Sequence, residues 1–98
     1  MTAAQNSYID TLRRFKQEYG AEYGIKQIGF FGSVARGDQT AESDVDVVVD
    51  APELGLFKMV GMRLKLEEVF SKSVDLVAKS EYMRTRLKNR IEKEAVYV

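Results

Sequence analysis

The sequence predicts an α/β (α+β) fold, a small mixed sheet of about three strands with helices packed on one side. Two observations carry this prediction. The chain has 98 residues, of which 45% are hydrophobic, which is enough for the core of a single domain over residues 1–98. Helix-like and strand-like periodicities alternate along it, in the order helix, strand, turn, strand, helix, strand, helix.

The first helix is predicted from an apolar stripe that begins just after Ser7, a residue type that caps helix N-termini. Gly20 and Gly24 mark its end. Aromatic residues at helical spacing usually pack in a core, so we interpret the stripe as structural and not as a site. Its members are Tyr8, Leu12, Phe15 and Tyr19.

Two strands are predicted next, on either side of a glycine-containing turn. Residues 25–31 form a short run with β-branched and aromatic side chains, and residues 45–49 form a second apolar run. Gly32 lets the backbone turn sharply and expose its N–H groups, and Ser33 can cap a short helical turn. Pro52 stops the second strand, because proline cannot donate to a central ladder.

The remaining chain predicts a helix, a strand and a last helix. Residues 74–77 form a short third strand, and Ser80 is expected to cap the last helix. Residues 95–98 are apolar, so they could pack back on the domain or against a partner. The apolar stripe that predicts the middle helix consists of Leu56, Val60, Leu64, Val69 and Phe70.

Composition narrows the chemistry that this chain can perform. It has no Cys and no His, which excludes disulfides, thiolates and imidazole bases and leaves oxygen as the ligand for any metal. Its 15 basic residues equal its 15 acidic ones, without the basic excess typical of proteins that grip long nucleic acids, so we expect no direct nucleic-acid binding. No signal pattern or membrane-length apolar run is present, so we expect no membrane association and a cytoplasmic location.

The second predicted strand carries two carboxylates, Asp44 and Asp46. Residues two apart on a strand point to the same face, where their charges repel unless a cation or a proton lies between them. A turn with free N–H groups and a serine precedes this pair. Donors for phosphate oxygens beside hard oxygen ligands for Mg²⁺ are what a metal–nucleoside triphosphate requires.

Asp75 lies in the middle of the third predicted strand, between Val74 and Leu76. An acid within an apolar strand is unfavourable unless it is paired or binds a cation. If the second and third strands are neighbours, Asp75 can reach the other two carboxylates. Three such groups can hold two Mg²⁺ ions about 3.5–4 Å apart for in-line attack on a phosphoryl group, with Asp75 as ligand or base.

Each of these signals has an ordinary explanation when taken alone. Two acids at a strand edge are usually solvated, a lone Gly-Ser pair is uninformative, and Asp75 could be an exposed edge residue. Their combination is less ordinary. Gly, Ser and two Asp at set spacings match by chance on the order of once in a thousand chains of this length.

The spacing of these residues resembles a known signature. Residues 32–37 (GSVARG), five further residues and then residues 43–48 (SDVDVV) are similar to the motif of the minimal nucleotidyltransferases, in the DNA polymerase beta superfamily. The later VDLV segment with Asp75 resembles the third acid of that family, and residues 87–98 resemble its C-terminal helix. The resemblance spans nearly the whole chain and implies a polymerase-beta-like nucleotidyltransferase fold.

The resemblance also implies roles for individual residues. Asp44 and Asp46 would be the metal-binding pair, and Asp75 the third catalytic and metal-binding carboxylate. The residues implied to bind the nucleotide are Gly32, Ser33, Arg36 and Ser43.

Small members of this family resemble the antitoxin half of HEPN/MNT toxin–antitoxin pairs. This implies an Mg²⁺-dependent enzyme that transfers AMP from ATP to a tyrosine of a HEPN-domain ribonuclease toxin and so neutralises it. Two alternatives remain open. A nucleotidyltransferase acting on an aminoglycoside-like small molecule would share the motif, although such enzymes are usually longer. A non-catalytic antitoxin would neutralise its partner by covering it.

Overall fold

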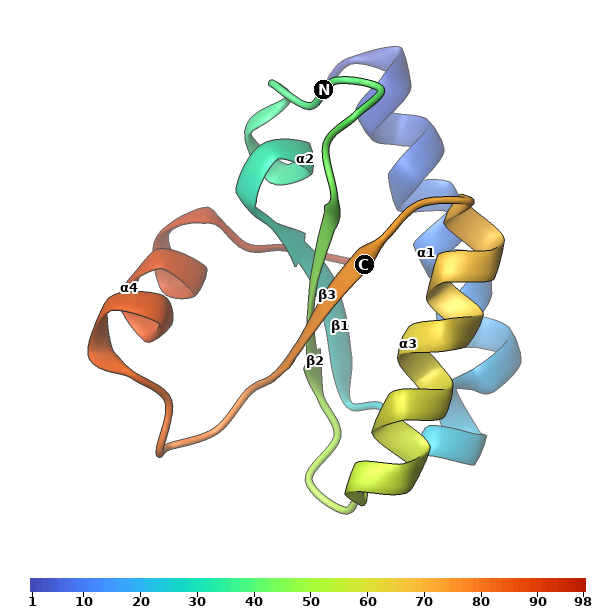
Figure 1. Cartoon of the computed structure of the whole chain (residues 1–98), viewed down its shortest axis with the longest axis vertical. Helices are drawn as coiled ribbons and strands as arrows, with labels where there is room; N and C mark the ends of the chain where they lie inside the picture. The colour runs from blue at the N-terminus through green and yellow to red at the C-terminus, as the bar shows by residue number, and fades with distance from the viewer.

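A four-stranded mixed sheet in the order β3-β2-β1-β4 forms the centre of the computed structural model, which describes residues 1–98 (Figure 1). Strand β1 pairs antiparallel with both β2 and β4, while β2 and β3 are parallel and are connected through α3. The elements are α1 (Ala3–Tyr23), β1 (Gln27–Phe31), α2 (Gly32–Arg36), β2 (Val45–Asp50), α3 (Leu56–Phe70), β3 (Val74–Ala78), α4 (Thr85–Glu94) and β4 (Val96–Tyr97).

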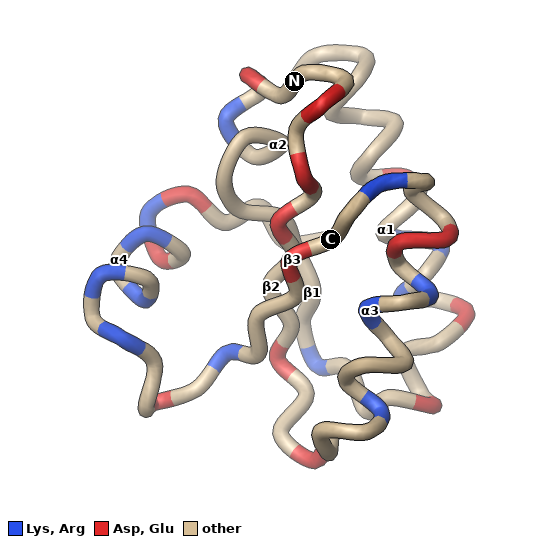
Figure 2. Tube along the Cα trace, in the orientation of Figure 1, with Lys and Arg blue, Asp and Glu red and all other residues tan.

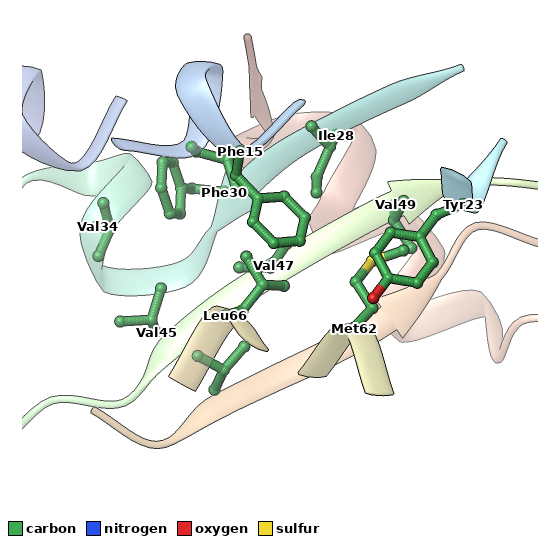
Figure 3. Close-up of a cluster of buried hydrophobic side chains, with 12 residues drawn as sticks. Phe15, Tyr23, Ile28, Phe30, Val34, Val45, Val47, Val49, Met62 and Leu66 are labelled. Atoms are coloured by element: carbon green, nitrogen blue, oxygen red, sulfur yellow. The ribbon is translucent and has the colours of Figure 1, made fainter. Parts of the chain in front are cut away.

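Alternate side chains of the central strands face opposite sides of the sheet, as the two-residue period of a strand requires. Val47 and Val49 belong to the main core with residues of α1 and α3, and Figure 3 shows them there. Val48 packs instead with Phe31 and with Ile91 of α4. In Figure 1 the sheet lies between α1 and α3 on one side and α4 on the other.

The predicted α/β class and mixed sheet are confirmed, with two differences in detail. The sheet gains a fourth strand, β4, from the apolar C-terminal residues. The helices cover both faces and not one, because the buried side chain of Ile91 holds α4 against the face opposite to α1 and α3. This second difference matters for function, since the predicted acids lie on the α4 face.

Helix α1 begins earlier than the sequence indicated. Its N-cap is Thr2, whose hydroxyl accepts a hydrogen bond from the Gln5 N–H, while the Gln5 side-chain Oε1 accepts one from the Thr2 N–H. Ser7 therefore lies inside the helix. The buried Gln5 side chain also donates to the carbonyl oxygens of Val34 and Ala35 at 3.1 and 3.3 Å, which ties α1 to α2. The interpretation of the aromatic stripe as core is confirmed.

Helix α3 buries a different stripe from the one predicted. Met62 and Leu66 are fully buried, whereas Leu56 is 82% exposed and the side chains of Val60 and Leu64 are also exposed. The prediction of the buried face was wrong except at Phe70, which packs against the main core. The reason is that this helix is apolar on two sides. Only one side can pack on the sheet, and nothing in the helical period ranks the two.

The C-terminal residues complete the sheet. Val96 and Tyr97 pair with Phe30 and Gly29, and a Cβ on Gly29 would come within 2.9 Å of the Tyr97 Cα. The expectation that this segment packs back on the domain is thus met. Ser80 does not cap the last helix, which begins at Thr85, and its hydroxyl accepts a hydrogen bond from the Tyr82 N–H. None of the helices has the length and apolar character needed to cross a membrane.

Candidate active site

The turn between β1 and α2 strongly favours glycine at position 32. The backbone of Gly32 has a φ of +69°, a region that side chains disfavour. A Cβ there would also collide with the Oδ2 of Asp46. This contact follows from the sheet register, which places Asp46 opposite Phe31, the residue just before the turn. The glycine therefore lets a carboxylate lie directly against the turn.

Ser33 lies within α2 and does not cap it. The N-cap position is Phe31, which offers no side-chain acceptor, and the hydroxyl of half-buried Ser33 makes no hydrogen bond within the chain. The prediction that Ser33 caps this short helix was wrong, because the helix starts at Gly32. Its free hydroxyl leaves Ser33 available to an incoming ligand, which is consistent with its predicted role.

The predicted acids approach one another across two neighbouring strands. Asp46 and Asp75 are direct partners in the parallel β2–β3 register, so their side chains leave the sheet on the same face. Asp44 precedes Asp46 by two residues at the start of β2. Figure 2 shows acidic segments of β2 and β3 near the middle of the molecule, with several basic segments along α4.

Electrostatics at Asp46 reflect this crowding. Burial raises the pKa of the Asp46 carboxyl above its usual value, and the negative charge of Asp75 raises it further. Arg90 opposes this shift, Asp44 adds to it, and Arg36 also opposes it. The ionised form of Asp46 is therefore disfavoured in the protein alone, and a cation placed among the acids would relieve the repulsion.

The donor set fits Mg²⁺ in its chemistry, because all three side chains offer hard, anionic oxygens. The three carboxylates are nevertheless spread out. No three acidic side chains lie close enough together to form a ready-made metal cluster. Asp44 and Asp75 are both exposed, and exposed side chains can change rotamer at little cost, so they are free to turn toward a cation.

A fourth acid, Glu94, meets the turn from the end of α4. Its carboxylate accepts hydrogen bonds from the Gly32 N–H at 3.1 Å and from Arg36 Nη1 at 3.2 Å. Arg90 Nε lies 3.6 Å from the same carboxylate, and its guanidinium lies 5.6 Å from the centre of the Phe31 ring. Sequence reasoning missed both Glu94 and Arg90, because 62 residues separate Glu94 from Gly32 and no local signal links them.

The remaining predicted site residues differ in their surroundings. Arg36 is held near the turn by Glu94 and by Asp38, whose carboxylate accepts from Arg36 Nε at 3.0 Å. Ser43 uses its hydroxyl to close the preceding loop, accepting from the Thr40 N–H at 2.9 Å. The structure thus brings Arg36 to the turn, while the hydrogen bonds of Ser43 stay within its own loop.

An open cavity of about 580 Å³ lies elsewhere on the α4 face. Asp50, Lys79 and Met83 are among its lining residues, together with Ile91, and it contains none of the predicted site residues. Asp50 lies four residues beyond Asp46 on β2, roughly 13 Å along the strand. The predicted acids and this cavity therefore do not coincide, and we place the candidate active site at the acids, beside the Gly32 turn.

Comparison with known proteins agrees with this geometry. Residues 11–98 match the model of the nucleotidyltransferase domain family. Protein adenylyltransferase MntA of Thermococcus cleftensis is 36% identical over 89% of this chain and 88% of its own length.

Solved structures give the same result. The solved structure of a candidate minimal nucleotidyltransferase has a TM-score of 0.72 and 30% identity, covering 90% of this chain and 93% of the other. A toxin–antitoxin structure with AMP-PNP has a TM-score of 0.69 and 25% identity, covering 95% of this chain and 70% of the other.

Proposed function

We propose that this chain, which belongs to the nucleotidyltransferase domain family, is an antitoxin that transfers AMP from ATP to a partner toxin. The observation that carries the proposal is the register of the sheet. It pairs Asp46 with Asp75 on neighbouring strands and sets Asp46 against the Gly32 turn. Carboxylates beside a phosphate-binding turn are what phosphoryl chemistry without His or Cys requires.

The residues of this chain would divide the work as follows. Ser33 and Arg36 would bind the triphosphate, with Gly32 shaping the turn and Ser43 supporting the loop that leads to the acids. Asp44, Asp46 and Asp75 would hold Mg²⁺, most simply as two ions, which when bound neutralise the triphosphate and lower the pKa of the acceptor hydroxyl. Asp75 is exposed at the site, so it can face an acceptor that approaches from solvent.

The reaction would be an in-line displacement at the α-phosphorus of ATP. The acceptor oxygen forms a bond to that phosphorus as the bond to the leaving pyrophosphate breaks. The proton of the acceptor hydroxyl passes to a carboxylate, for which Asp75 is the candidate. The products are an AMP ester of the acceptor and pyrophosphate.

We propose a tyrosine of a HEPN-domain ribonuclease toxin as the acceptor, with the reaction taking place in the cytoplasm. Two observations support a protein acceptor. The MntA relative is named a protein adenylyltransferase, and a similar solved structure is a toxin–antitoxin with AMP-PNP.

The test uses the protein together with its co-purified partner, Mg²⁺ and ATP labelled at the α-phosphate. We expect label on the partner protein, lost with Asp44→Ala and retained with Asp10→Ala, which removes an exposed acid of α1, the helix that covers the opposite face of the sheet. Label on an added aminoglycoside would instead favour the small-molecule enzyme. A tight complex that never takes up label would favour an antitoxin that acts by binding alone.

A further inference from the structure

The carboxylate of Glu94 connects the last turn of α4 to the turn after β1. It accepts from the Gly32 N–H at 3.1 Å and from Arg36 Nη1 at 3.2 Å, and Arg90 Nε lies 3.6 Å away. One side chain from the C-terminal part of the chain thus contacts both the Gly32 backbone and the Arg36 guanidinium of the proposed triphosphate site. None of these contacts is local in sequence except that to Arg90.

The backbone around Glu94 is fixed on both sides. Ile91, three residues earlier, is 2% exposed in the cluster with Phe31 and Val48, and its carbonyl accepts from the Ala95 N–H at 2.8 Å. Two residues later, Val96 begins β4 in register with β1. Glu94 cannot leave the turn by a movement of α4 unless this packing and pairing are lost.

Without its hydrogen-bond partners, the carboxylate of Glu94 would be in an unfavourable location. An acid in the last turn of a helix faces the negative end of the helix dipole. Its side chain is 21% exposed, so water replaces its partners only in part. The Gly32 N–H and the two guanidinium groups compensate this cost, and releasing them would leave a partly buried carboxylate without hydrogen bonds.

Arg36 is the group on which this arrangement acts. Its Nε is held by Asp38 and its Nη1 by Glu94, so the plane of the guanidinium is set while Nη2 has no partner within the chain. A guanidinium held at two nitrogens presents the third in a defined direction, which lowers the entropy lost when it binds a phosphate oxygen.

We infer that Glu94 is a positioning residue for the triphosphate, orienting Arg36 and fixing the Gly32 turn without touching the substrate. The inference rests on the proposed function, because it names a determinant of the same site. The opposite role, in which Glu94 competes with the triphosphate for these donors, would require it to abandon three partners. The two roles predict opposite effects on nucleotide binding.

The first test compares Glu94→Ala with Glu92→Ala, which removes an exposed acid two residues earlier on α4. With the co-purified partner as acceptor, Glu94→Ala should raise the KM for ATP about tenfold and change kcat by less than about twofold. Glu94→Gln keeps an acceptor oxygen and should recover part of the loss. Glu92→Ala should match the wild-type protein.

A second test measures binding without catalysis, using calorimetry with inorganic tripolyphosphate. If Glu94 acts through Arg36, the effects of Arg36→Gln and Glu94→Gln on the dissociation constant should be non-additive, with the double variant close to the weaker-binding single one. Melting temperatures check that each variant folds. Should Glu94→Ala fail to fold, the isosteric Glu94→Gln carries both tests.

The outcomes separate this inference from the proposed function. A wild-type protein that transfers AMP, with Glu94 variants that have unchanged KM and lower melting temperature, would show a purely structural residue and overturn the inference alone. A lower KM in Glu94→Ala would also overturn it, in favour of competition. A wild-type protein that binds neither ATP nor tripolyphosphate would overturn both.

Discussion

The face of the sheet beneath α1 and α3 and the face beneath α4 are formed by alternate residues of the same strands, yet they are covered differently. The first is packed by a continuous apolar cluster of twelve buried residues. The second has three buried apolar residues, and beside them β2 and β3 place Asp46 and Asp75. The first face therefore supplies most of the stability, which leaves the second face free to hold charged groups near solvent.

The largest expected effect separates two acids on the α4 face. Asp46→Ala should lower AMP transfer by about a thousandfold, because it removes a metal-binding oxygen donor beside the Gly32 turn. Asp50→Ala changes the same strand and the same face four residues further on, and should leave transfer within about twofold. Initial rates with labelled ATP measure both. Equal losses in the two variants would mean that the whole face, and not the acid cluster, supports activity.

Core substitutions compare the two faces in stability. Leu66→Ala, on the α3 side, should lower the free energy of unfolding by about 3–4 kcal/mol, because its large cluster cannot close the cavity. Ile91→Ala should cost about 2 kcal/mol, because the few neighbours of this side chain can relax toward solvent. Urea denaturation measures both values. The comparison fails if Ile91→Ala proves the more costly change.

Two glycines give a matched pair of smaller effects. Gly32→Ala should lower the free energy of unfolding by about 1–2 kcal/mol and displace Asp46, because the position combines a positive φ with a collision. Gly61→Ala lies within α3 with open space around it, and should raise the free energy of unfolding by about 0.5–1 kcal/mol. Thermal unfolding with a transfer assay distinguishes them. A stable, active Gly32→Ala variant would contradict the contact with Asp46.

The smallest effect is a dependence on pH. In the metal-free protein the pKa of the Asp46 carboxyl is raised above its usual value of 3.8. The neutral carboxyl therefore stabilises the folded state at pH values below 3.8, and this stabilisation is lost as the pH rises through the raised pKa. Asp46→Asn is neutral at every pH, so it should raise the melting temperature by about 1–2 °C at pH 7, a small gain because the side chain is half-exposed. The gain should shrink as the pH approaches 4. A gain that is constant with pH would mean that charge is not its cause.

Local patterns were sufficient for most of the elements and for the core of the site. The two-residue strand period put Asp44 and Asp46 on one face before any partner strand was known, and an acid in the next strand pointed to Asp75. The parallel pairing that brings Asp46 and Asp75 together fulfilled the condition on which their convergence was predicted. Their roles as catalytic and metal-binding residues remain predictions for the transfer assay.

Sequence patterns gave wrong predictions where two alternatives fitted the local sequence equally well. Helix α3 is apolar on both sides, and only contact with the sheet selected Met62 and Leu66 over Leu56 and Leu64. The capping of α1 was similarly ambiguous, since Thr2 and Ser7 are both suitable caps, and the buried Gln5 completes the cap at Thr2. In α3 contacts with residues distant in sequence decided between local alternatives, whereas in α1 the Thr2–Gln5 capping box within the first turn did so.

By itself, the sequence determined the class of fold, the order of its elements, the glycine-serine turn and the faces that carry the three aspartates. These features depend on backbone geometry within a few residues, which a local period records. Only the tertiary structure decided that α4 covers the second face and that Glu94 reaches Gly32 and Arg36. Such contacts depend on which packing of the whole chain has the lowest free energy, and no short segment contains that information.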